Sequence, residues 1–243
     1  MLTLAAGMPR AGSGWHYNLL HDLILAGGGR DARVIRKRYL LHPFLTEVNC
    51  NIRALSAKRL LPVMLPAVLG NEFAIKTHSA PSPLAKRLME TGRMRVSYIY
   101  RDPRAALLSA MEYGQRARAA GSTNAFSPLE NFEDALQFIL DYVHIGEQWL
   151  GLDTVHSLSY ENFLNNYEDE TQRMIAFLDI EKYQPEVDVV LAKYHPHSKG
   201  AESKGMHFQY GEAQRFRSVL TSDELEQANN SLSPHLERMD YEI

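Results

Sequence analysis

The chain has 243 residues, 45% of them hydrophobic and 23% charged, which is ordinary for a soluble globular protein and enough to bury one core in a single domain, residues 1–243. Its formal net charge of −3 argues against a general binder of nucleic acid or acidic membranes, because such binders usually carry a basic excess. Cys50 is the only cysteine, so no intrachain disulfide can form and the cytoplasm is the expected location. The most apolar stretch, residues 60–69, is far shorter than the ~20 residues that a membrane span requires, and the apolar residues before Pro9 end too soon for a signal peptide.

A Gly-rich turn follows the first predicted strand. Residues 2–6 are an apolar run, residues 15–25 have helical spacing, and the segment PRAGSGW, residues 9–15, connects them. In this order of strand, turn and helix, the unpaired N–H groups at the helix start attract an anion, and glycine lets the backbone approach it closely. Taken alone, the turn is equally typical of a tight bend.

The next part of the chain is basic and then irregular. Five basic residues fall within residues 30–38, for which a solvated helix face is favoured over a site for an acidic partner. Residues 39–51 have no clear period and indicate a loop or a short strand. Residues 56–69 are predicted to form a helix that Pro62 and Pro66 interrupt.

Two further units of strand, turn and helix follow. Residues 73–75 and 96–100 are short runs suited to strands. A helix entry at residues 79–83 follows the first of these strands, and helical spacing over residues 104–118 follows the second. Strands that alternate with helices predict an α/β fold with three layers, in which helices flank a central parallel sheet.

The second half of the chain is predicted to be mostly helical. Helical spacing covers residues 129–150, 170–178 and 187–191, a strand is expected over residues 154–158, and a capping-box-like start at residues 221–224 opens the last helix. Residues 121–128 and 193–211 are polar and lack a period. The second of these segments is typical of a ligand-covering loop or of a disordered one.

Basic side chains follow the predicted strands. In open parallel sheets, ligands bind at the carboxyl ends of the strands, so residues just after each strand converge on one crevice. Here these residues are Arg10, Lys76, His78, Arg101 and Tyr160. Four of these five are basic or can become so, which favours an anion-binding site over a neutral pocket.

A P-loop kinase or another nucleotide phosphotransferase is one candidate for such a site. Residues 7–12 supply the two glycines of the loop G-x-x-x-x-G-K-[ST], but Ser13-Gly14 stand where a lysine for the terminal phosphates and a hydroxyl for Mg²⁺ are needed. Asp102 is next to the strand end, yet it is expected to point elsewhere. A donor of an anionic group that needs no metal therefore fits better.

Several segments resemble those of the sulfotransferases that use 3′-phosphoadenosine-5′-phosphosulfate (PAPS), in the order that the family has them. The segment PRAGSGW is similar to their P-loop-like 5′-phosphosulfate-binding loop, and Lys76-Thr77-His78 to their K-T-H segment. Arg101 and Ser109 reproduce the R-x7-S spacing of the 3′-phosphate site, and Tyr160-Glu161 resembles the Tyr-Glu pair near the adenine. The resemblance covers residues 2–178.

The resemblance implies in-line transfer of the sulfuryl group from PAPS to an acceptor hydroxyl, or less readily an amine, with release of adenosine 3′,5′-bisphosphate and no metal ion. It implies that His78 is the general base and that Lys76 and Arg10 stabilise the transferring group and the leaving phosphate. The cofactor-binding residues that it implies are Arg10, Ala11, Gly12, Ser13, Gly14, Trp15, Arg101, Ser109, Tyr160, Lys204 and Gly205.

The chain departs from the family pattern in two places. The cytosolic-type loop usually has lysine at the position of Arg10 and threonine at that of Gly14. The late R-K-G element of the family has no exact counterpart. Lys199-Gly200 and Lys204-Gly205 are both candidates, and Lys204-Gly205 is preferred because the residues after it resemble those that follow the element in the family. A catalytically silent nucleotide-binding module therefore stays open as a further alternative, although intact His78 and Lys76 argue against it.

The acceptor itself stays open among small molecules, glycans and lipids, and a nucleic-acid partner is not expected. Acceptor pockets in this family come from variable segments, which here are residues 39–51, 113–132 and 193–211. Three aromatic residues in these segments are candidates to line such a pocket or to pack in the core: Phe44, Tyr113 and Phe126.

Overall fold

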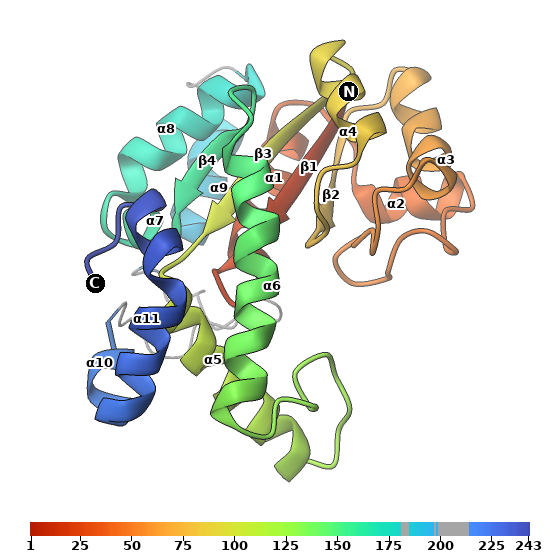
Figure 1. Cartoon of the computed structure of the whole chain (residues 1–243). Coiled ribbons are helices and arrows are strands. Elements are labelled where there is room, and N and C mark those ends of the chain that lie inside the picture. The colour runs from red at the N-terminus through yellow and green to blue at the C-terminus, as the bar shows by residue number, and fades with distance from the viewer. Residues whose placement is uncertain (181–184, 197, 199–213) are drawn as a thin grey trace.

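A parallel sheet forms the centre of the molecule. The computed structural model describes residues 1–180, 185–196, 198 and 214–243. Within these residues the sheet has four strands, β1 (Leu2–Gly7), β2 (Phe73–Thr77), β3 (Met94–Tyr100) and β4 (His156–Ser159), in the order β2-β1-β3-β4. Every pair of neighbours is parallel, so all four carboxyl ends lie at one edge of the sheet (Figure 1).

The strands bury side chains on both faces, as the strands of a parallel sheet do. In β1, Leu2, Leu4 and Ala6 contribute to one core cluster, whereas Ala5 contributes to another. The same alternation separates Val96 from Ile99 in β3. Because both faces are apolar, each needs a layer of helices to cover it, and the predicted three-layer α/β fold is confirmed.

One face is covered by helices from the first unit and from the second half of the chain. They are α1 (Ser13–Ala26), α7 (Tyr160–Asn165), α8 (Tyr167–Leu178) and α9 (Pro185–Tyr194). Their apolar side chains, among them Leu19, Phe163 and Met174, pack with Ala5, Ala74 and Ile99 of the sheet.

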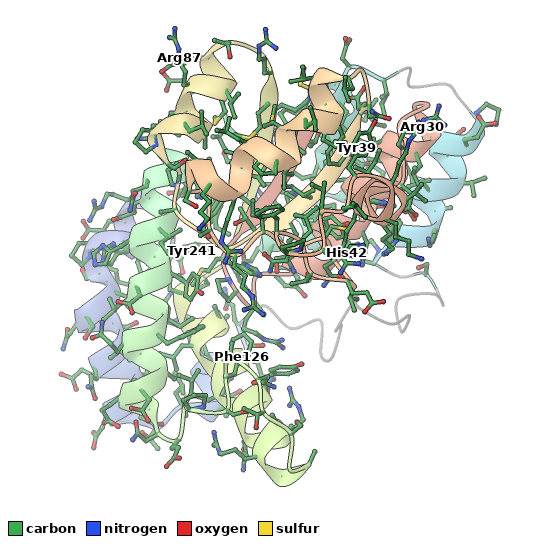
Figure 2. The ribbon with its side chains drawn as sticks, turned by 90° about the vertical axis from the view of Figure 1, so that its right-hand side faces the viewer. Arg30, Tyr39, His42, Arg87, Phe126 and Tyr241 are labelled. Atoms are coloured by element: carbon green, nitrogen blue, oxygen red, sulfur yellow. The ribbon has the colours of Figure 1, made fainter. Side chains whose placement is uncertain are left out.

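The opposite face is covered by α2 (Ala32–Arg38), α3 (Ala57–Val68), α4 (Pro83–Glu90) and the last turns of α6 (Phe132–Leu150). Helix α3 runs unbroken through Pro62 and Pro66, so the expected interruption is wrong. The two prolines are four residues apart, and therefore they remove hydrogen bonds on one side of the helix only. Figure 2 looks onto this side of the molecule, where Arg30, Tyr39 and His42 are labelled.

A third helical group lies beyond the carboxyl ends of the strands (Figure 1). It consists of α5 (Pro103–Ala119), most of α6, α10 (Phe216–Val219) and α11 (Ser222–Arg238). Met8 and Ala11, from the turn after β1, pack into the same cluster. The space between the strand ends and this group is therefore where a ligand can be held.

The irregular segment at residues 39–51 runs along the free edge of β2. An isolated bridge between Asn51 and Lys76 attaches it to β2, and a second bridge, Leu45 with Ile52, folds the segment back on itself. Of the expected ligand-covering loop at residues 193–211, positions 197 and 199–211 lie outside the described residues. No helix in the described part of the chain combines the length and the apolarity that crossing a membrane takes.

Candidate active site

A cavity of about 200 Å³ opens at the carboxyl ends of the strands. It brings together ten of the residues that the sequence places in the site: Arg10, Gly12, Ser13, Gly14, Trp15, Lys76, His78, Arg101, Ser109 and Tyr160. The prediction that these side chains converge on one crevice is thus confirmed, because the strands are parallel and end together.

The turn after β1 forms the floor of the cavity. Arg10 and Gly12 both have left-handed backbone, with φ of 66° and 76°. A Cβ atom on Gly12 would lie 2.7 Å from the Tyr160 ring, so only glycine allows this close approach. The first hydrogen bond of α1 runs from the His16 N–H to the Gly12 carbonyl, and no side chain caps the helix. The N–H groups of its first turn thus present a partial positive charge to the cavity.

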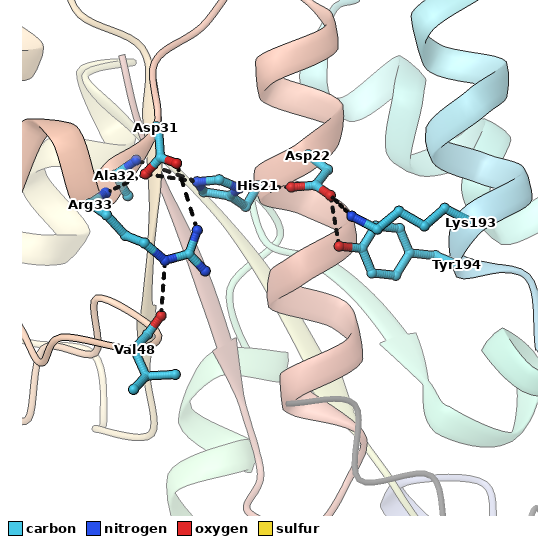
Figure 3. A network of polar contacts seen from close by, with 8 residues as sticks. All are labelled: His21, Asp22, Asp31, Ala32, Arg33, Val48, Lys193 and Tyr194. Atoms are coloured by element: carbon cyan, nitrogen blue, oxygen red, sulfur yellow. Dashed lines mark hydrogen bonds and ion pairs between the residues drawn. The ribbon is translucent and has the colours of Figure 1, made fainter. Parts of the chain in front are cut away.

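Helix α1 is held in place at its other end by a polar network (Figure 3). The Asp22 carboxylate accepts hydrogen bonds from Lys193 and Tyr194 of α9, each at 2.7 Å, and contacts the ring of His21 at 3.0 Å. Burial alone would raise the pKa of Asp22, but these donors hold it below its ordinary value. The network fixes α1 against α9, and with it the position of the anion-binding turn.

Arg10 is held by groups of α5 and of the segment after it. Its Nε donates to the Ser109 Oγ at 3.1 Å, and its guanidinium lies 4.4 Å from the centre of the Tyr113 ring and 5.7 Å from that of Phe126. Burial lowers the pKa of Arg10 to about 10, so the side chain stays charged at neutral pH. The Arg10 carbonyl accepts a hydrogen bond from Arg101 at 3.4 Å. These contacts fix one cation in the cavity wall.

Lys76 and His78 reach the cavity from the end of β2. Lys76 is 7% exposed, and burial, with a smaller effect of Arg10, lowers its pKa to about 8. Burial and the nearby Lys76 lower the pKa of His78 to about 3, although its hydrogen bond to Gly7 acts the other way. The Nδ1–H of His78 donates to the Gly7 carbonyl at 2.6 Å, which leaves the unprotonated lone pair on Nε2. His78 is thus a neutral imidazole in the tautomer that accepts a proton at Nε2.

Arg101 lies against the residues that follow β4. Its guanidinium is 4.4 Å from the centre of the Tyr160 ring, and its Nε is 3.9 Å from the Glu161 carboxylate. Glu161 is itself positioned by Tyr241, which donates to it at 2.8 Å. Arg101 and Ser109 line the same cavity, as their spacing predicts.

Three predicted cofactor-binding residues are placed differently from the rest. Ala11 is fully buried and packs into the third helical group without lining the cavity, because the turns at Arg10 and Gly12 direct it away. Lys204 and Gly205 lie outside the described residues. Trp15 touches the cavity but is only 2% exposed; its ring stacks on Phe163 at 3.9 Å and its Nε1–H donates to the Tyr194 carbonyl. Most of its surface is core.

The cavity also contains residues that sequence reasoning did not assign to it. Pro9 and Asn49 complete the lining, together with Tyr113 and Phe126, which were expected either in an acceptor pocket or in the core. Asn49 stands in the segment without periodicity, where nothing in the sequence distinguishes it. Phe44, the third aromatic candidate, does not line this cavity; it lines a separate one.

Asp102, the carboxylate nearest to the place where a magnesium-dependent enzyme would have a metal ligand, interacts with Arg104 instead. Its carboxylate caps α5 by accepting from the Arg104 N–H at 2.9 Å and forms an ion pair with the Arg104 guanidinium at 2.8 Å. Among the described residues, one group of His and acidic side chains is spaced as metal ligands are: His144, Glu147 and His235, none of which lines the cavity. Glu147 is also paired with Arg238 at 3.0 Å. Metal independence stays a prediction.

Comparisons with known proteins agree with this geometry. A retinol dehydratase bound to androsterone and the inactive cofactor PAP has a TM-score of 0.63 at 16% identity, over 100% of this chain and 82% of that one. The mouse sulfotransferase SULT7A1 in complex with PAP has a TM-score of 0.61 at 14% identity, over 98% of this chain and 85% of that one. These likenesses show a shared fold. A search of curated proteins found no match. The model of the sulfotransferase domain matches residues 3–239, and the chain therefore belongs to the sulfotransferase domain family.

Proposed function

We propose that the cavity binds PAPS and that the enzyme passes its sulfuryl group to an acceptor hydroxyl, or less readily to an amine. The observation that carries this proposal is the meeting of an anion-binding turn, three cations and one neutral histidine in a single cavity. The two similar structures hold PAP, the nucleotide that remains when PAPS loses its sulfuryl group, and this supports the choice of cosubstrate.

The nucleotide is expected to lie along the cavity from Arg101 to Lys76. Arg101 and Ser109 offer a guanidinium and a hydroxyl to the 3′-phosphate, which can bind them together. The first turn of α1, with Ser13 and Gly14 in the cavity lining, is the expected binding site of the 5′-phosphosulfate. The Tyr160 ring and the small part of Trp15 that reaches the cavity are the expected contacts of the adenine. A second phosphate ligand from Lys204-Gly205 stays a prediction.

In the proposed reaction the acceptor oxygen attacks the sulfur atom of PAPS while Nε2 of His78 takes the proton from the acceptor. A new S–O bond forms as the bond between sulfur and the oxygen of the 5′-phosphate breaks, and adenosine 3′,5′-bisphosphate leaves with that electron pair. Arg10 and Lys76 are placed to stabilise the charge that develops on the leaving oxygen and the sulfuryl group. No step in this sequence uses a metal ion.

A bound anion is also expected to make His78 a stronger base. The residues of the protein alone keep the pKa of His78 low, through burial and the charge of Lys76. A nearby anion favours the protonated imidazole, so PAPS is expected to raise this pKa and make His78 a stronger base when the substrate is present. General bases of this kind contribute about 10²–10⁴ in rate.

The test is a label-transfer assay with ³⁵S-PAPS and a panel of phenols, sugars, lipids and aliphatic alcohols. The variant His78→Ala is expected to lose turnover, whereas adenosine 3′,5′-bisphosphate should still raise its melting temperature, because His78 does not hold the nucleotide. A wild-type protein that adenosine 3′,5′-bisphosphate fails to stabilise would refute the proposal, and turnover retained in the variant would remove His78 as the base. A kinase or a silent nucleotide-binding module would transfer no label at all.

A further inference from the structure

We propose that a second cavity, beside the active site, binds the acidic group of the acceptor. This proposal rests on the proposed function and extends it. It assigns the acceptor to the class of anionic molecules, which carry a carboxylate, sulfate or phosphate. This cavity, which we call the arginine cavity, has a volume of about 300 Å³, and its lining includes Arg36, Arg53, Arg59 and His42.

The arginine cavity gathers positive charge without a counter-ion. Among the described residues, none of its three arginines forms an ion pair with a carboxylate, and no Asp or Glu lines it. Elsewhere the chain does pair exposed arginines, as in Arg33 with Asp31 at 3.7 Å and Arg95 with Glu72 at 3.1 Å. Three guanidinium groups around one cavity repel one another, and an anion between them offsets this repulsion.

The arginines come from three elements that the fold fixes relative to one another. Arg36 lies on α2, Arg59 on α3, and Arg53 on the segment that leads to α3. Arg36 donates from Nε to the Leu45 carbonyl at 2.9 Å, which orients the guanidinium. Among the basic residues at 30–38, Arg36 is half-buried in the cavity wall, whereas the other four are exposed, as the predicted solvated face requires.

A short segment of chain separates the arginine cavity from the active site. Asn49 lines the active-site cavity, whereas Asn51 and Arg53 line the arginine cavity. The same segment is hydrogen-bonded to the catalytic strand end: the Ile52 N–H donates to the Lys76 carbonyl at 2.8 Å, and the Ser79 hydroxyl donates to the Arg53 carbonyl at 2.6 Å. In Figure 2, His42 is labelled on the α2 and α3 side and Phe126, from the active-site cavity, lies below it.

This separation is short enough for one acceptor to span. The four-residue step from Asn49 to Arg53 covers at most about 14 Å of extended chain. An acidic disaccharide, or a long-chain alcohol with a terminal phosphate, has a length on this order, so its hydroxyl can lie at His78 while its acidic group lies at Arg53 and Arg59.

The first arm of the test measures binding alone. Inorganic phosphate is titrated by calorimetry into the protein while adenosine 3′,5′-bisphosphate saturates the active-site cavity. Phosphate should bind the wild type, and the double variant Arg53→Gln/Arg59→Gln should weaken this binding at least about tenfold, because each arginine contributes a charge-assisted hydrogen bond. Lys58→Gln, an exposed neighbour of Arg59 outside the lining, is the matched control and should bind phosphate as the wild type does.

The second arm asks whether the acidic group belongs to the acceptor. Label transfer is compared for matched pairs, such as 1,8-octanediol with its monophosphate, or a neutral disaccharide with its uronic-acid form. The acidic member should have at least about tenfold higher kcat/KM in the wild type, and the double variant should lose this preference while it keeps its turnover of the neutral member.

Each outcome is decisive. A wild type that binds no phosphate, or a double variant that binds it unchanged, overturns the arginine cavity as an anion site. Phosphate binding without a preference for acidic acceptors leaves a site for a free anion and overturns the assignment of the acceptor. If neither member of any pair accepts label, the proposed function fails, whereas the phosphate titration still decides the anion site.

Discussion

The Nε of Arg10 donates to the Oγ of Ser109 at 3.1 Å, although the two residues are 99 positions apart in the chain. The bond connects the turn after β1, where we propose that the 5′-phosphosulfate binds, with α5, where we propose that the 3′-phosphate binds. A lysine at position 10 could reach one of these regions as a point charge, but it could not stack on Tyr113 and hold Ser109 at the same time. Arginine here joins the two halves of the nucleotide site.

Arg10→Ala should therefore lower kcat by about 10²–10³, the usual cost of losing one donor to a developing oxyanion. Arg10→Lys should fall between this variant and the wild type, because it keeps the charge and loses the bond to Ser109. Label transfer under saturating ³⁵S-PAPS measures both. Lys86→Ala, which removes an exposed cation on α4, should leave kcat unchanged. Equal rates for Arg10→Ala and the wild type would contradict the role of Arg10.

Arg101→Ala tests the 3′-phosphate site. The variant should weaken binding of adenosine 3′,5′-bisphosphate by about 10- to 100-fold, since hydrogen bonds to charged groups contribute about 1.5–3 kcal/mol. Adenosine 5′-monophosphate, which lacks the 3′-phosphate, should bind the variant and the wild type almost equally. Calorimetric titration with the two nucleotides gives the comparison. Equal losses for both nucleotides would mean that Arg101 supports the cavity without reading the 3′-phosphate.

The meeting of the basic residues in one cavity could be predicted from their positions at the ends of parallel strands. Arg10, His78 and Arg101 lie within three residues after the end of a strand, and Lys76 is the last residue but one of β2. Because parallel strands end at one edge, no knowledge of helix packing was needed to bring these four residues together. Spacing also sufficed for Ser109, two turns into the helix after Arg101.

Residues that reach the site through tertiary packing could not be predicted in this way. Tyr113 and Phe126 meet Arg10 because the chain after α5 folds back beside it, where the Phe126 carbonyl packs against Gly114. Ala11 was expected to bind the cofactor because it stands in the motif, but the local backbone angles, which the sequence does not reveal, direct it into the core. Asn49 and the arginine cavity depend on how an irregular segment runs along β2.

Lys76 should set an alkaline limb in the pH profile. Its pKa is lowered to about 8, chiefly by burial, so in the free enzyme the charge is present below this pH and is lost above it. The value of kcat/KM for PAPS should therefore fall as the pH rises through about 8. Lys76→Arg, whose side chain stays charged, should remove this limb. A profile in the variant that still falls near the same pH would assign the limb to another group.

Three histidines whose pKa values are lowered should make the fold sensitive to acid. The pKa values of His78 and His156 are lowered to about 3 and about 4, and that of His16 is also lowered, in each case chiefly by burial. Unfolded histidine titrates near about 6.5, so below that pH the unfolded state binds more protons than the folded state. Their contribution to stability is thus complete above about pH 6.5 and is lost as the pH falls toward the folded pKa values.

His156→Gln provides the test of this acid sensitivity, because His156 does not line the active-site cavity. In the wild type, the free energy of unfolding changes with pH, and each such histidine adds about 1.4 kcal/mol per pH unit to this slope between its folded and its unfolded pKa values. The variant should be less stable at neutral pH, where it loses the bond to Ser97, and should show a shallower loss of stability between pH values of about 6 and 4. Denaturant unfolding across this range gives both quantities. A curve for His156→Gln that runs parallel to that of the wild type would contradict the prediction.

Gly12→Ala, compared with a control glycine, distinguishes the cost of left-handed backbone strain from the cost of a steric clash with Tyr160. Gly12 has left-handed backbone, and an added Cβ would also lie 2.7 Å from the Tyr160 ring. Gly92→Ala is a matched control, because Gly92 has φ of 65° and open space around its Cβ position. Left-handed strain should cost each variant about 1–2 kcal/mol of unfolding free energy. Gly12→Ala should lose more than this, and it alone should weaken the binding of adenosine 3′,5′-bisphosphate, because the ring that faces the adenine is displaced. Denaturant unfolding and nucleotide titration measure the two effects, and equal behaviour of the two variants would show that Tyr160 tolerates the added methyl group.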